Sequence, residues 1–223
     1  MIIFDMAGTT IDEDNLVYKT VQKALNTYHC PADLLTVLSF AAGKEKREAI
    51  HDTYVAVMGH APDDALLDQM HAFFREQLGI AYEENPMQLF PGVNQILAEL
   101  KDRQVIRVFN TGYTKEVAEK ILTKVGVTVG EDIDALITAD MVEHSRPAPD
   151  MIHLAMQQFS CQAGEVVKIG DSMVDIQEGQ EAGVKFSVGI TTGAQQRAEL
   201  AQANPAFIID HMDELLPQIA IHE

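Results

Sequence analysis

The chain begins MIIFDMAGTTIDEDN (residues 1–15). An apolar run at 2–4 predicts a short buried strand that ends at the carboxylate of Asp5. A turn of small residues follows at once, in which Gly8 has access to backbone angles that strain other residues. The residue two positions after the acid is Ala7, which has no ionisable group. The stretch therefore predicts a strand that delivers one carboxylate to a tight turn.

Five further segments share the apolar character of the first strand. They are residues 105–109, 135–137, 166–169, 185–190 and 206–209. Apolar residues at helical spacing separate several of these segments, at 115–125, 151–159 and 174–182. Alternating strands and helices are typical of a parallel sheet with helices on both faces. We therefore predict an α/β fold with a doubly wound, Rossmann-like parallel sheet.

The segment between the first strand and the remaining strands has a different pattern. Its residues fit one helix after another, at 16–28, 31–40, 44–58 and 64–82. Breakers at Asn85-Pro86 and Phe90-Pro91-Gly92 mark the return to the strand–helix pattern. We therefore expect an α/β core formed by 1–13 and 86–223, with an all-helical cap domain inserted at 14–85.

Composition limits the classes of partner. The chain has 223 residues, of which 47% are hydrophobic, and a formal net charge of -18. This charge repels polyanions, so we expect neither nucleic acid nor a membrane as a partner. No apolar run approaches the ~18 residues of a membrane span, and we see no signal-peptide pattern. Cys30 and Cys161 lack metal or redox spacing and are expected to be reduced thiols of a cytoplasmic protein.

Polar groups stand where the predicted strands end. In chain order they are Asp5, Thr111 with Gly112, Arg146, and Asp171 with Asp175. Ligands of open α/β sheets bind beyond the carboxyl ends of the strands, so these groups are expected to meet in one crevice. Carboxylates, a hydroxyl, a backbone amide and a guanidinium together suit phosphoryl chemistry.

The acids divide into a nucleophile and metal ligands. The Asp5 carboxylate can attack phosphorus to form an aspartyl-phosphate. Asp5, Asp171 and the backbone carbonyl of Ala7 are candidate oxygen ligands for Mg²⁺, which would offset the repulsion between Asp5 and an anionic substrate. Asp175 is expected to lie behind these ligands and to orient Arg146, Asp171 or a metal-bound water.

The other groups are expected to bind phosphate. Thr111 and the Gly112 amide, at the start of a helix, can donate to phosphate oxygens, and Arg146 offers a charged fork to the same oxygens. Each residue also has an ordinary structural alternative. Thr111 or Asp171 could be a helix N-cap, Arg146 a solvated loop charge, and Asp175 an exposed acid in a first helical turn. The coincidence of four such strand ends favours one phosphate and metal site.

The order of these motifs resembles the haloacid dehalogenase superfamily of phosphotransferases. The likeness spans nearly the whole chain, through motifs at 5–10, 111, 146–149 and 170–175. That superfamily usually has a second Asp where this chain has Ala7, and a Lys where it has Arg146. Both departures, together with TGYT at 111–114, resemble its phosphonoacetaldehyde hydrolase (phosphonatase) branch. The resemblance implies Mg²⁺ as cofactor, a catalytic set of Asp5, Thr111 and Arg146, and phosphate contacts from Thr9, Gly112 and Arg146.

The phosphonatase branch also implies a cap lysine that forms a Schiff base with the substrate aldehyde. The iminium accepts electrons when the C–P bond breaks, so no acid is needed beside the nucleophile. The spacing Gly-x-x-Lys selects Lys46, with Lys44 as a further substrate-binding cation. The branch has Met and His at the positions of Ala42 and Ala49. The alternative is that Lys44, Lys46 and Arg47 form a solvated basic patch or an anion clamp.

We therefore expect a Mg²⁺-dependent, phosphonatase-like hydrolase that acts on a small phosphonate or phosphorylated metabolite. One alternative is a general small-molecule phosphate-ester phosphatase of the same superfamily, for which Ala7 would restrict turnover to good leaving groups. Another is a non-catalytic phospho-acceptor or phosphate-binding module, which the position of Asp5 on the first strand and the large helical insert disfavour. The resemblance also implies a homodimer formed through the cap.

Overall fold

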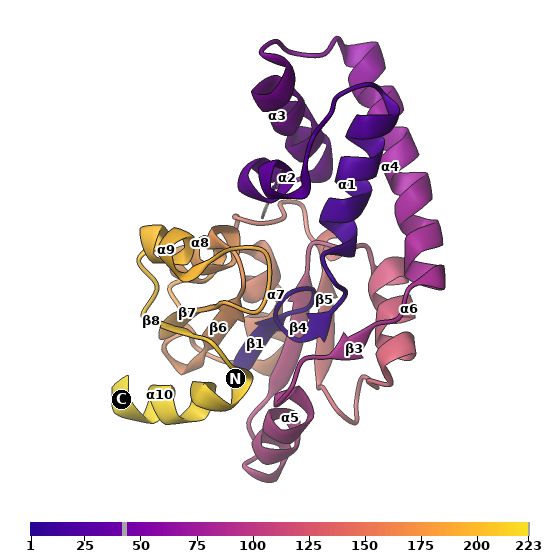
Figure 1. Ribbon diagram of the computed structural model, residues 1–223. Helices are drawn as coiled ribbons and strands as arrows, with labels where there is room; N and C mark the ends of the chain where they lie inside the picture. Colours follow the sequence, from indigo (N-terminus) through magenta and orange to yellow (C-terminus); the bar gives the residue numbers. More distant parts are fainter. Residues whose placement is uncertain (42–43, 223) are drawn as a thin grey trace. The chain divides into compact units, whose positions relative to one another are not determined.

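The computed structural model describes residues 1–41 and 44–222 (Figure 1). The chain forms two compact units. The sheet unit consists of Met1–Asp12 and Met87–Glu223, and the helical unit consists of Glu13–Pro86. The chain therefore leaves the sheet unit once, shortly after its first strand, and returns to it once.

A six-stranded parallel sheet forms the centre of the sheet unit. Its strands are β1 (Ile2–Asp5), β4 (Arg107–Thr111), β5 (Ala135–Thr138), β6 (Val167–Gly170), β7 (Phe186–Ile190) and β8 (Phe207–Ile209). Their order is β5-β4-β1-β6-β7-β8, and every neighbouring pair runs parallel. The predicted α/β fold with a doubly wound parallel sheet is confirmed.

Two strands extend further than their apolar runs predict. β1 includes Asp5, which lies in register with Asn110 of β4, and β4 continues to Thr111, opposite Thr138 of β5. All four of these side chains are buried. Backbone pairing continues through polar residues when their side chains find partners inside the protein, and an apolar pattern cannot reveal such partners. The carboxyl edge of the sheet is consequently polar.

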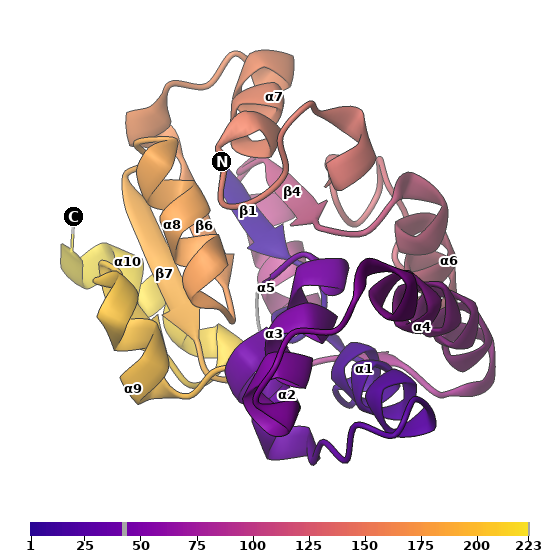
Figure 2. The ribbon, with the colours of Figure 1, turned by 90° about the horizontal axis from the view of Figure 1, so that it is seen from above.

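The helices of the sheet unit cover both faces of the sheet. They are α5 (Val93–Asp102), α6 (Lys115–Val125), α7 (Asp150–Phe159), α8 (Met173–Glu181), α9 (Arg197–Leu200) and α10 (Leu215–His222). The path β1–β4–β5 crosses the sheet in one direction, and the path β5–β6–β7 crosses it in the other. Right-handed crossovers therefore place α5 and α6 on one face and α7 and α8 on the other. In Figure 2, β1 and β4 lie between α5 and α7.

A hydrophobic core holds β1, β4 and β5 against α7. Ile3, Val108 and Ile137 of the strands are fully buried there with Met151 and Ile152 of α7. Removal of this apolar surface from water stabilises the layer by roughly 1.5–3 kcal/mol for each large side chain. The core fixes the register of the central strands, and it thereby fixes the polar residues at their carboxyl ends.

Two very short strands connect the sheet unit to the insert. β2 (Ile11–Asp12) pairs antiparallel with β3 (Gln88–Leu89), so that Asp12 lies opposite Gln88. The amide of Phe90 also donates to the carbonyl of Thr10 over 3.0 Å. Two-residue strands are too short for a periodic pattern, so the sequence did not predict them.

The helical unit contains four helices in its described residues. They are α1 (Leu16–Thr27), α2 (Leu34–Ala41), α3 (Lys46–Met58) and α4 (Asp64–Glu84). α1 packs against each of the other three. α2 begins three residues later than its pattern predicts, because the side chain of Asp33 accepts the amide of Thr36 over 2.7 Å at the helix start. In the same way, Glu45 and Asp63 cap α3 and α4.

The structure bears on two further predictions, the absence of a membrane span and the reduced state of the cysteines. Among the described residues, no helix is both long enough and apolar enough to cross a membrane. Cys30 and Cys161 are both free thiols. The structure therefore contains no disulfide between the two cysteines, as their spacing predicts.

Candidate active site

The strand order creates a crevice at the ends of β1 and β6. These two strands are neighbours in the sheet, but the chain continues from β1 toward β4 and from β6 toward β7. Helices that follow the two strands therefore lie on opposite faces, which leaves the carboxyl ends open between them. Asp5 is the last residue of β1, and Asp171 directly follows β6. The structure thus brings two of the predicted acids to the topological switch point.

Three carboxylates meet in this crevice. Asp5, Asp171 and Asp175 each place a carboxylate oxygen within 4.8 Å of the other two, and all three side chains are buried. Oxygen donors at this separation suit a hard divalent cation. The cluster is therefore a candidate metal site.

The turn after β1 holds Asp5 in place. The carbonyl of Met6 accepts the amides of Thr9, Thr10 and Ile11 over 3.3, 2.9 and 2.8 Å. The Thr10 hydroxyl donates to the Asp5 carbonyl over 2.9 Å. These bonds close a tight turn, so that the strand end and its carboxylate have little freedom. Ala7 lies in this turn, and the use of its carbonyl as a metal ligand stays a prediction.

Glycines surround the Asp171 carboxylate. A Cβ on Gly8, whose φ is +86°, would lie 2.4 Å from Asp171 Oδ2, and a Cβ on Gly193 would lie 2.0 Å from the same atom. Neither distance is possible for a real side chain, so both positions require glycine as long as Asp171 stays in place. Asp171 Oδ2 accepts the Ala194 amide over 2.7 Å, and the Thr9 hydroxyl lies 3.4 Å from Oδ1. The Thr9 hydroxyl thus donates to Asp171 in this structure, and its use as a phosphate contact stays a prediction.

Asp175 lies in the first turn of α8, where Ser172 is the N-cap residue. The Ser172 hydroxyl donates to Asp175 Oδ2 over 2.6 Å. The alternative that Asp171 caps this helix is therefore wrong, because the adjacent serine does so. Asp175 is 1% exposed, so the alternative of an exposed first-turn acid is also wrong.

Arg146 reaches the crevice from the loop between β5 and α7. Its Nη1 lies 2.7 Å from Asp5 Oδ1 and 2.8 Å from Asp175 Oδ1. Its Nη2 donates to the Asn110 carbonyl over 2.8 Å. The side chain is only 12% exposed, so the alternative of a solvated loop charge is wrong. Arg146 is therefore a largely buried cation that contacts two acids of the cluster.

The acids of the cluster differ in how well their charges are compensated. Burial raises the pKa of Asp5, and the charge of Asp175 raises it further against the opposing effect of Arg146 and Lys168. Burial and the charges of Asp5 and Asp175 raise the pKa of Asp171 well above its ordinary value. Burial also acts on Asp175, but Arg146 and Lys168 bring its pKa below the ordinary value. A divalent cation between Asp5 and Asp171 would stabilise both ionised carboxylates.

Thr111 and Gly112 occupy the end of β4. Thr111 is buried, and its hydroxyl accepts the Tyr113 amide over 3.2 Å. The N-cap of α6 is Thr114, so Thr111 does not cap that helix. Gly112 is exposed and lies before the helix, so the expectation that its amide belongs to the helix start is wrong. The chain needs three further residues after Thr111 to turn into α6.

The predicted lysines belong to the helical unit. Lys44 Nζ forms an ion pair with Asp52. Lys46 is the first residue of α3; its Nζ donates to the Lys44 carbonyl over 2.9 Å and lies 5.4 Å from the centre of the Tyr18 ring. Arg47 pairs with Asp68 over 2.8 Å. The three cations have partners within the helical unit, and their role as a Schiff-base amine, an anion clamp or a solvated patch stays a prediction.

The phosphonatase branch has Met and His where this chain has Ala42 and Ala49. Ala49 lies in α3 and is fully buried. Ala42 lies outside the described residues. His51, the histidine nearest to Ala49 in the chain, places its Nδ1 2.9 Å from Asp52 Oδ1.

Sequence reasoning did not assign Asn110, Lys168 and Glu178 to the site. All three are fully buried. Lys168 Nζ lies 3.0 Å from Asp175 Oδ1, and the Asn110 side chain donates to Glu178 Oε1 over 2.8 Å. Two signals could have found Lys168 and Glu178: a lysine inside the apolar run of β6, and an acid one helical turn after Asp175.

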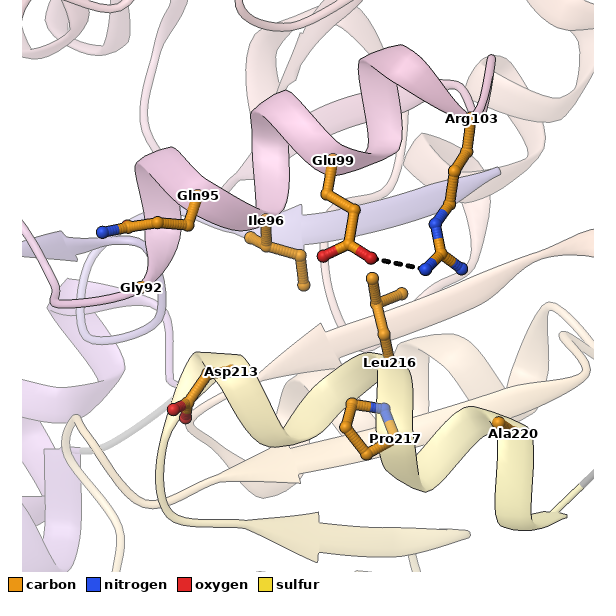
Figure 3. A pocket seen from close by; sticks show the side chains of 9 residues that line it. All are labelled: Gly92, Gln95, Ile96, Glu99, Arg103, Asp213, Leu216, Pro217 and Ala220. Carbon is orange, nitrogen blue, oxygen red and sulfur yellow. Dashed lines mark hydrogen bonds and ion pairs between the residues drawn. The ribbon is translucent and has the colours of Figure 1, made fainter.

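A pocket of about 390 Å³ elsewhere in the sheet unit lies between α5 and α10 (Figure 3). Ile96 and Leu216 point into it, and the Glu99–Arg103 ion pair lies at one side. None of the nine described residues that line it belongs to the carboxylate cluster. The candidate active site is therefore the crevice at the sheet edge and not this pocket.

Comparisons with known proteins agree on one family. The family profile described as haloacid dehalogenase-like hydrolase matches residues 2–189. "Probable phosphatase IndB" of Dickeya dadantii is 27% identical over 216 residues, which are 97% of this chain and 91% of that protein. Phosphonoacetaldehyde hydrolase of Bacillus cereus is 31% identical over 208 residues, which are 87% of this chain and 76% of that enzyme.

A solved structure supports the fold in the same way. A hydrolase from Pseudomonas syringae matches with a TM-score of 0.81 at 18% identity, over 99% of this chain and 97% of that chain. The family profile includes the strand that carries Asp5 and the segment that carries Asp171 and Asp175. The expected superfamily and enzyme class are therefore confirmed, and the chain belongs to the haloacid dehalogenase-like hydrolases.

Proposed function

We propose that the protein is a Mg²⁺-dependent, phosphonatase-like hydrolase that transfers the phosphoryl group of a small phosphonate or phosphorylated metabolite to Asp5 and then to water. One observation carries the proposal. The Asp5 carboxylate lies in a three-carboxylate cluster and is held by Arg146 over 2.7 Å, while position 7 provides no acid.

Asp5 is the nucleophile in this proposal. Arg146 binds its Oδ1, so the other carboxylate oxygen is the atom that attacks phosphorus and forms the aspartyl-phosphate. Water then attacks phosphorus, breaks the bond to the Asp5 oxygen, and regenerates the carboxylate. Thr111, Gly112 and the Arg146 guanidinium are the donors proposed for the phosphoryl oxygens.

The charges of the crevice favour a divalent cation. Among the described residues of the cluster, four buried carboxylates (Asp5, Asp171, Asp175 and Glu178) face two buried cations, Arg146 and Lys168. One divalent cation would offset the remaining two negative charges. Mg²⁺ would polarise a phosphoryl oxygen and shield Asp5 from the substrate charge. Asp5 and Asp171 are its proposed ligands, with Asp175 held behind them by Arg146 and Lys168.

Ala7 decides which leaving groups suit the site. Because no acid stands two residues after Asp5, a leaving group cannot receive its proton from that position. In the phosphonatase reaction the electron pair of the broken C–P bond passes instead to an iminium on a lysine. Lys46 is the proposed amine, at the start of α3 and next to the Tyr18 ring. The relative named phosphonoacetaldehyde hydrolase, at 31% identity, supports this assignment.

A phosphate-ester phosphatase is the second candidate. One observation favours it: Ala49, which stands where the phosphonatase branch has a histidine, is fully buried in α3. Imine chemistry would therefore lack that proton carrier. A relative of similar length is named as a probable phosphatase. Such an enzyme would hydrolyse esters of good leaving groups faster than those of poor ones.

A substrate panel with chemical trapping separates the two candidates. The protein is incubated with Mg²⁺ and phosphonoacetaldehyde, other phosphonates or phosphate esters, and phosphate release is measured before and after borohydride. Lys46→Arg keeps the charge of the proposed amine but cannot form the imine. Lys23→Ala is the matched control, because Lys23 is an exposed lysine of α1 whose Nζ donates to Gln77.

The results of the panel distinguish the phosphonatase activity from the ester phosphatase activity. Phosphate release from phosphonoacetaldehyde, with a borohydride adduct that Lys46→Arg alone abolishes, supports the phosphonatase activity. Release from esters only, with no adduct and full activity in Lys46→Arg, replaces it with the second candidate. Turnover that survives Asp5→Asn would refute both, since each requires Asp5 as nucleophile.

A further inference from the structure

Arg146 and Lys168 bind the same three oxygen atoms. These atoms are Asn110 Oδ1, Asp175 Oδ1 and Glu178 Oε2, which we call the oxygen platform. Lys168 Nζ lies 2.6, 3.0 and 3.5 Å from them in that order. The Arg146 guanidinium lies 2.7, 2.8 and 3.0 Å from the same atoms. One cation comes from a loop and the other from the middle of β6, so the platform lies between them.

The platform engages every nitrogen of the Arg146 guanidinium. Nη2 donates to Asn110, and Nη1 and Nε form ion pairs with Asp175 and Glu178. The last contact is short but poorly aligned for a hydrogen bond. With all three nitrogens held, the plane of the guanidinium is fixed, and Nη1 is directed at Asp5 as well. A lysine at position 146 would have one nitrogen and could not be oriented in this way.

Lys168 contacts the platform from within the sheet. Its Nζ is fully buried and contacts no acid other than those of the platform among the described residues. Without this ammonium, the Asp175 and Glu178 carboxylates would face each other with one cation between them. Burial of an ion pair costs desolvation energy that an apolar pair would avoid. An apolar pair of residues would stabilise the fold at these two positions equally well, so stability alone does not account for Lys168 and Glu178.

We propose that Lys168 and Glu178 are positioning residues that hold the oxygen platform and thereby orient Arg146 against Asp5. The proposal rests on the proposed function in one respect, the use of Asp5 and Arg146 in phosphoryl transfer. Neither residue touches the reacting atoms. The orienting action that we propose passes through Arg146, which makes the proposal testable by the behaviour of that arginine.

Nuclear magnetic resonance of arginine side chains gives a test that needs no substrate. A guanidinium held at every nitrogen rotates slowly about its Nε–Cζ bond and gives separate Nη signals. In protein labelled with ¹⁵N-arginine, the Arg146 signals are identified by their loss in Arg146→Lys. We expect them to merge or broaden in Lys168→Met and in Glu178→Gln. Arg107, a buried arginine paired with Asp134 over 3.0 Å in the same unit, is the internal control.

Kinetics give the second readout. With whichever substrate releases phosphate, Glu178→Gln is expected to lower kcat about 10- to 100-fold and to change KM little, because the partners of site residues act at this scale. In an Arg146→Ala background the same substitution is expected to cause no further loss, since its effect passes through Arg146. Lys120→Met, which removes an exposed partner of Glu116, is the matched control and should leave both readouts unchanged.

The outcomes separate this proposal from the proposed function. Separate Arg146 signals in both single variants, or an equal loss of kcat with and without Arg146, would overturn the positioning role. If no substrate is turned over, the proposed function fails and the resonance test still decides. Removal of one buried charge can prevent folding, and the double variant Lys168→Met/Glu178→Gln avoids this because it removes opposite charges together. Merged Arg146 signals in that variant, with unchanged Arg107 signals, support the proposal.

Discussion

Arg146 Nη1 lies 2.7 Å from Asp5 Oδ1, although the two residues are 141 positions apart in the chain. The pair joins the end of β1 to the loop after β5 in a place shielded from water. The Arg146 guanidinium thereby binds one oxygen of Asp5, and this contact sets the orientation of the carboxylate. This asymmetry distinguishes the two oxygens of the acid before any substrate arrives.

Arg146→Lys is expected to lower phosphate release about 10- to 100-fold with little loss of thermal stability. A lysine keeps the positive charge, but it cannot contact Asp5, Asn110 and Glu178 at once, so Asp5 loses its fixed orientation. Initial rates and a thermal melt measured on the same preparation test this. Equal rates in the two proteins would show that charge alone is enough at this position.

Gly193→Ala is expected to weaken both Mg²⁺ binding and turnover. The new Cβ would lie 2.0 Å from Asp171 Oδ2, so the carboxylate must move out of the cluster. Gly164→Ala is the matched control, because a Cβ on Gly164 meets nothing within 4 Å. Calorimetric titration with Mg²⁺ gives the affinity of both variants. An unchanged affinity in Gly193→Ala would exclude Asp171 in its present position as a ligand.

Metal removal is expected to reveal repulsion between Asp5 and Asp171. In the presence of chelator, Asp171→Asn should melt at a higher temperature than the unsubstituted protein, because one of the crowded, buried carboxylates is gone. With Mg²⁺ at about 100 times its Kd, the unsubstituted protein should gain about 2.7 kcal/mol and the variant much less. The two melting curves should therefore exchange order between chelator and Mg²⁺. The same order in both conditions would contradict a cation between these acids.

Glu13 makes the stability of the helical unit depend on pH. Its carboxylate accepts the Val17 amide over 3.1 Å, and burial raises its pKa to about 7, although the amides of Val17 and Leu16 and the charges of Lys46 and Lys19 act in the opposite direction. The unfolded chain releases this proton near pH 4.5, whereas the folded chain keeps it until about pH 7. The protonated Glu13 side chain therefore makes its full contribution to the free energy of unfolding below pH 4.5, and this contribution is lost as the pH rises through 7.

Glu13→Gln is expected to remove this loss and to keep the acceptor for the Val17 amide. The shift of the pKa from 4.5 to about 7 corresponds to about 3 kcal/mol at pH 8. The variant should therefore be more stable than the unsubstituted protein at pH 8 and not at pH 4.5, as measured by urea unfolding. Glu48→Gln, on an exposed position of α3, is the control. A gain of the same size at both pH values would rule out titration of Glu13 as the cause.

Much of the fold could be predicted because apolar runs mark buried parallel strands. β1, β5 and β6 end within one residue of their predicted limits. β4 runs on through Asn110 and Thr111, because both side chains have partners inside the protein. Apolar periodicity cannot show this, and it cannot show two-residue strands such as β2 either.

Asp5 and Asp171 could be predicted as site acids because each stands at a strand end, and Asp175 because it follows Asp171 by four residues. Lys168 and Glu178 could not be found in that way. Lys168 lies inside its strand, and Glu178 lies one helical turn beyond Asp175, so neither position looks like a ligand position in the sequence. Their importance comes from contacts between β6, α8 and the loop that carries Arg146. Such contacts depend on tertiary structure, so the local pattern can mark Lys168 as unusual but cannot show which residues it contacts.

The pairing of Asp12 with Gln88 has a consequence for how this protein could change over time. All residues of the helical unit are inserted between two positions that are neighbours in an antiparallel ladder. A segment of different length or shape could replace them without altering the strand order or the packing beneath the acids. Selection could thus remodel the insert, and with it the lysine proposed for the leaving-group chemistry, while the carboxylate cluster is inherited unchanged through a connection of two paired strands of two residues each.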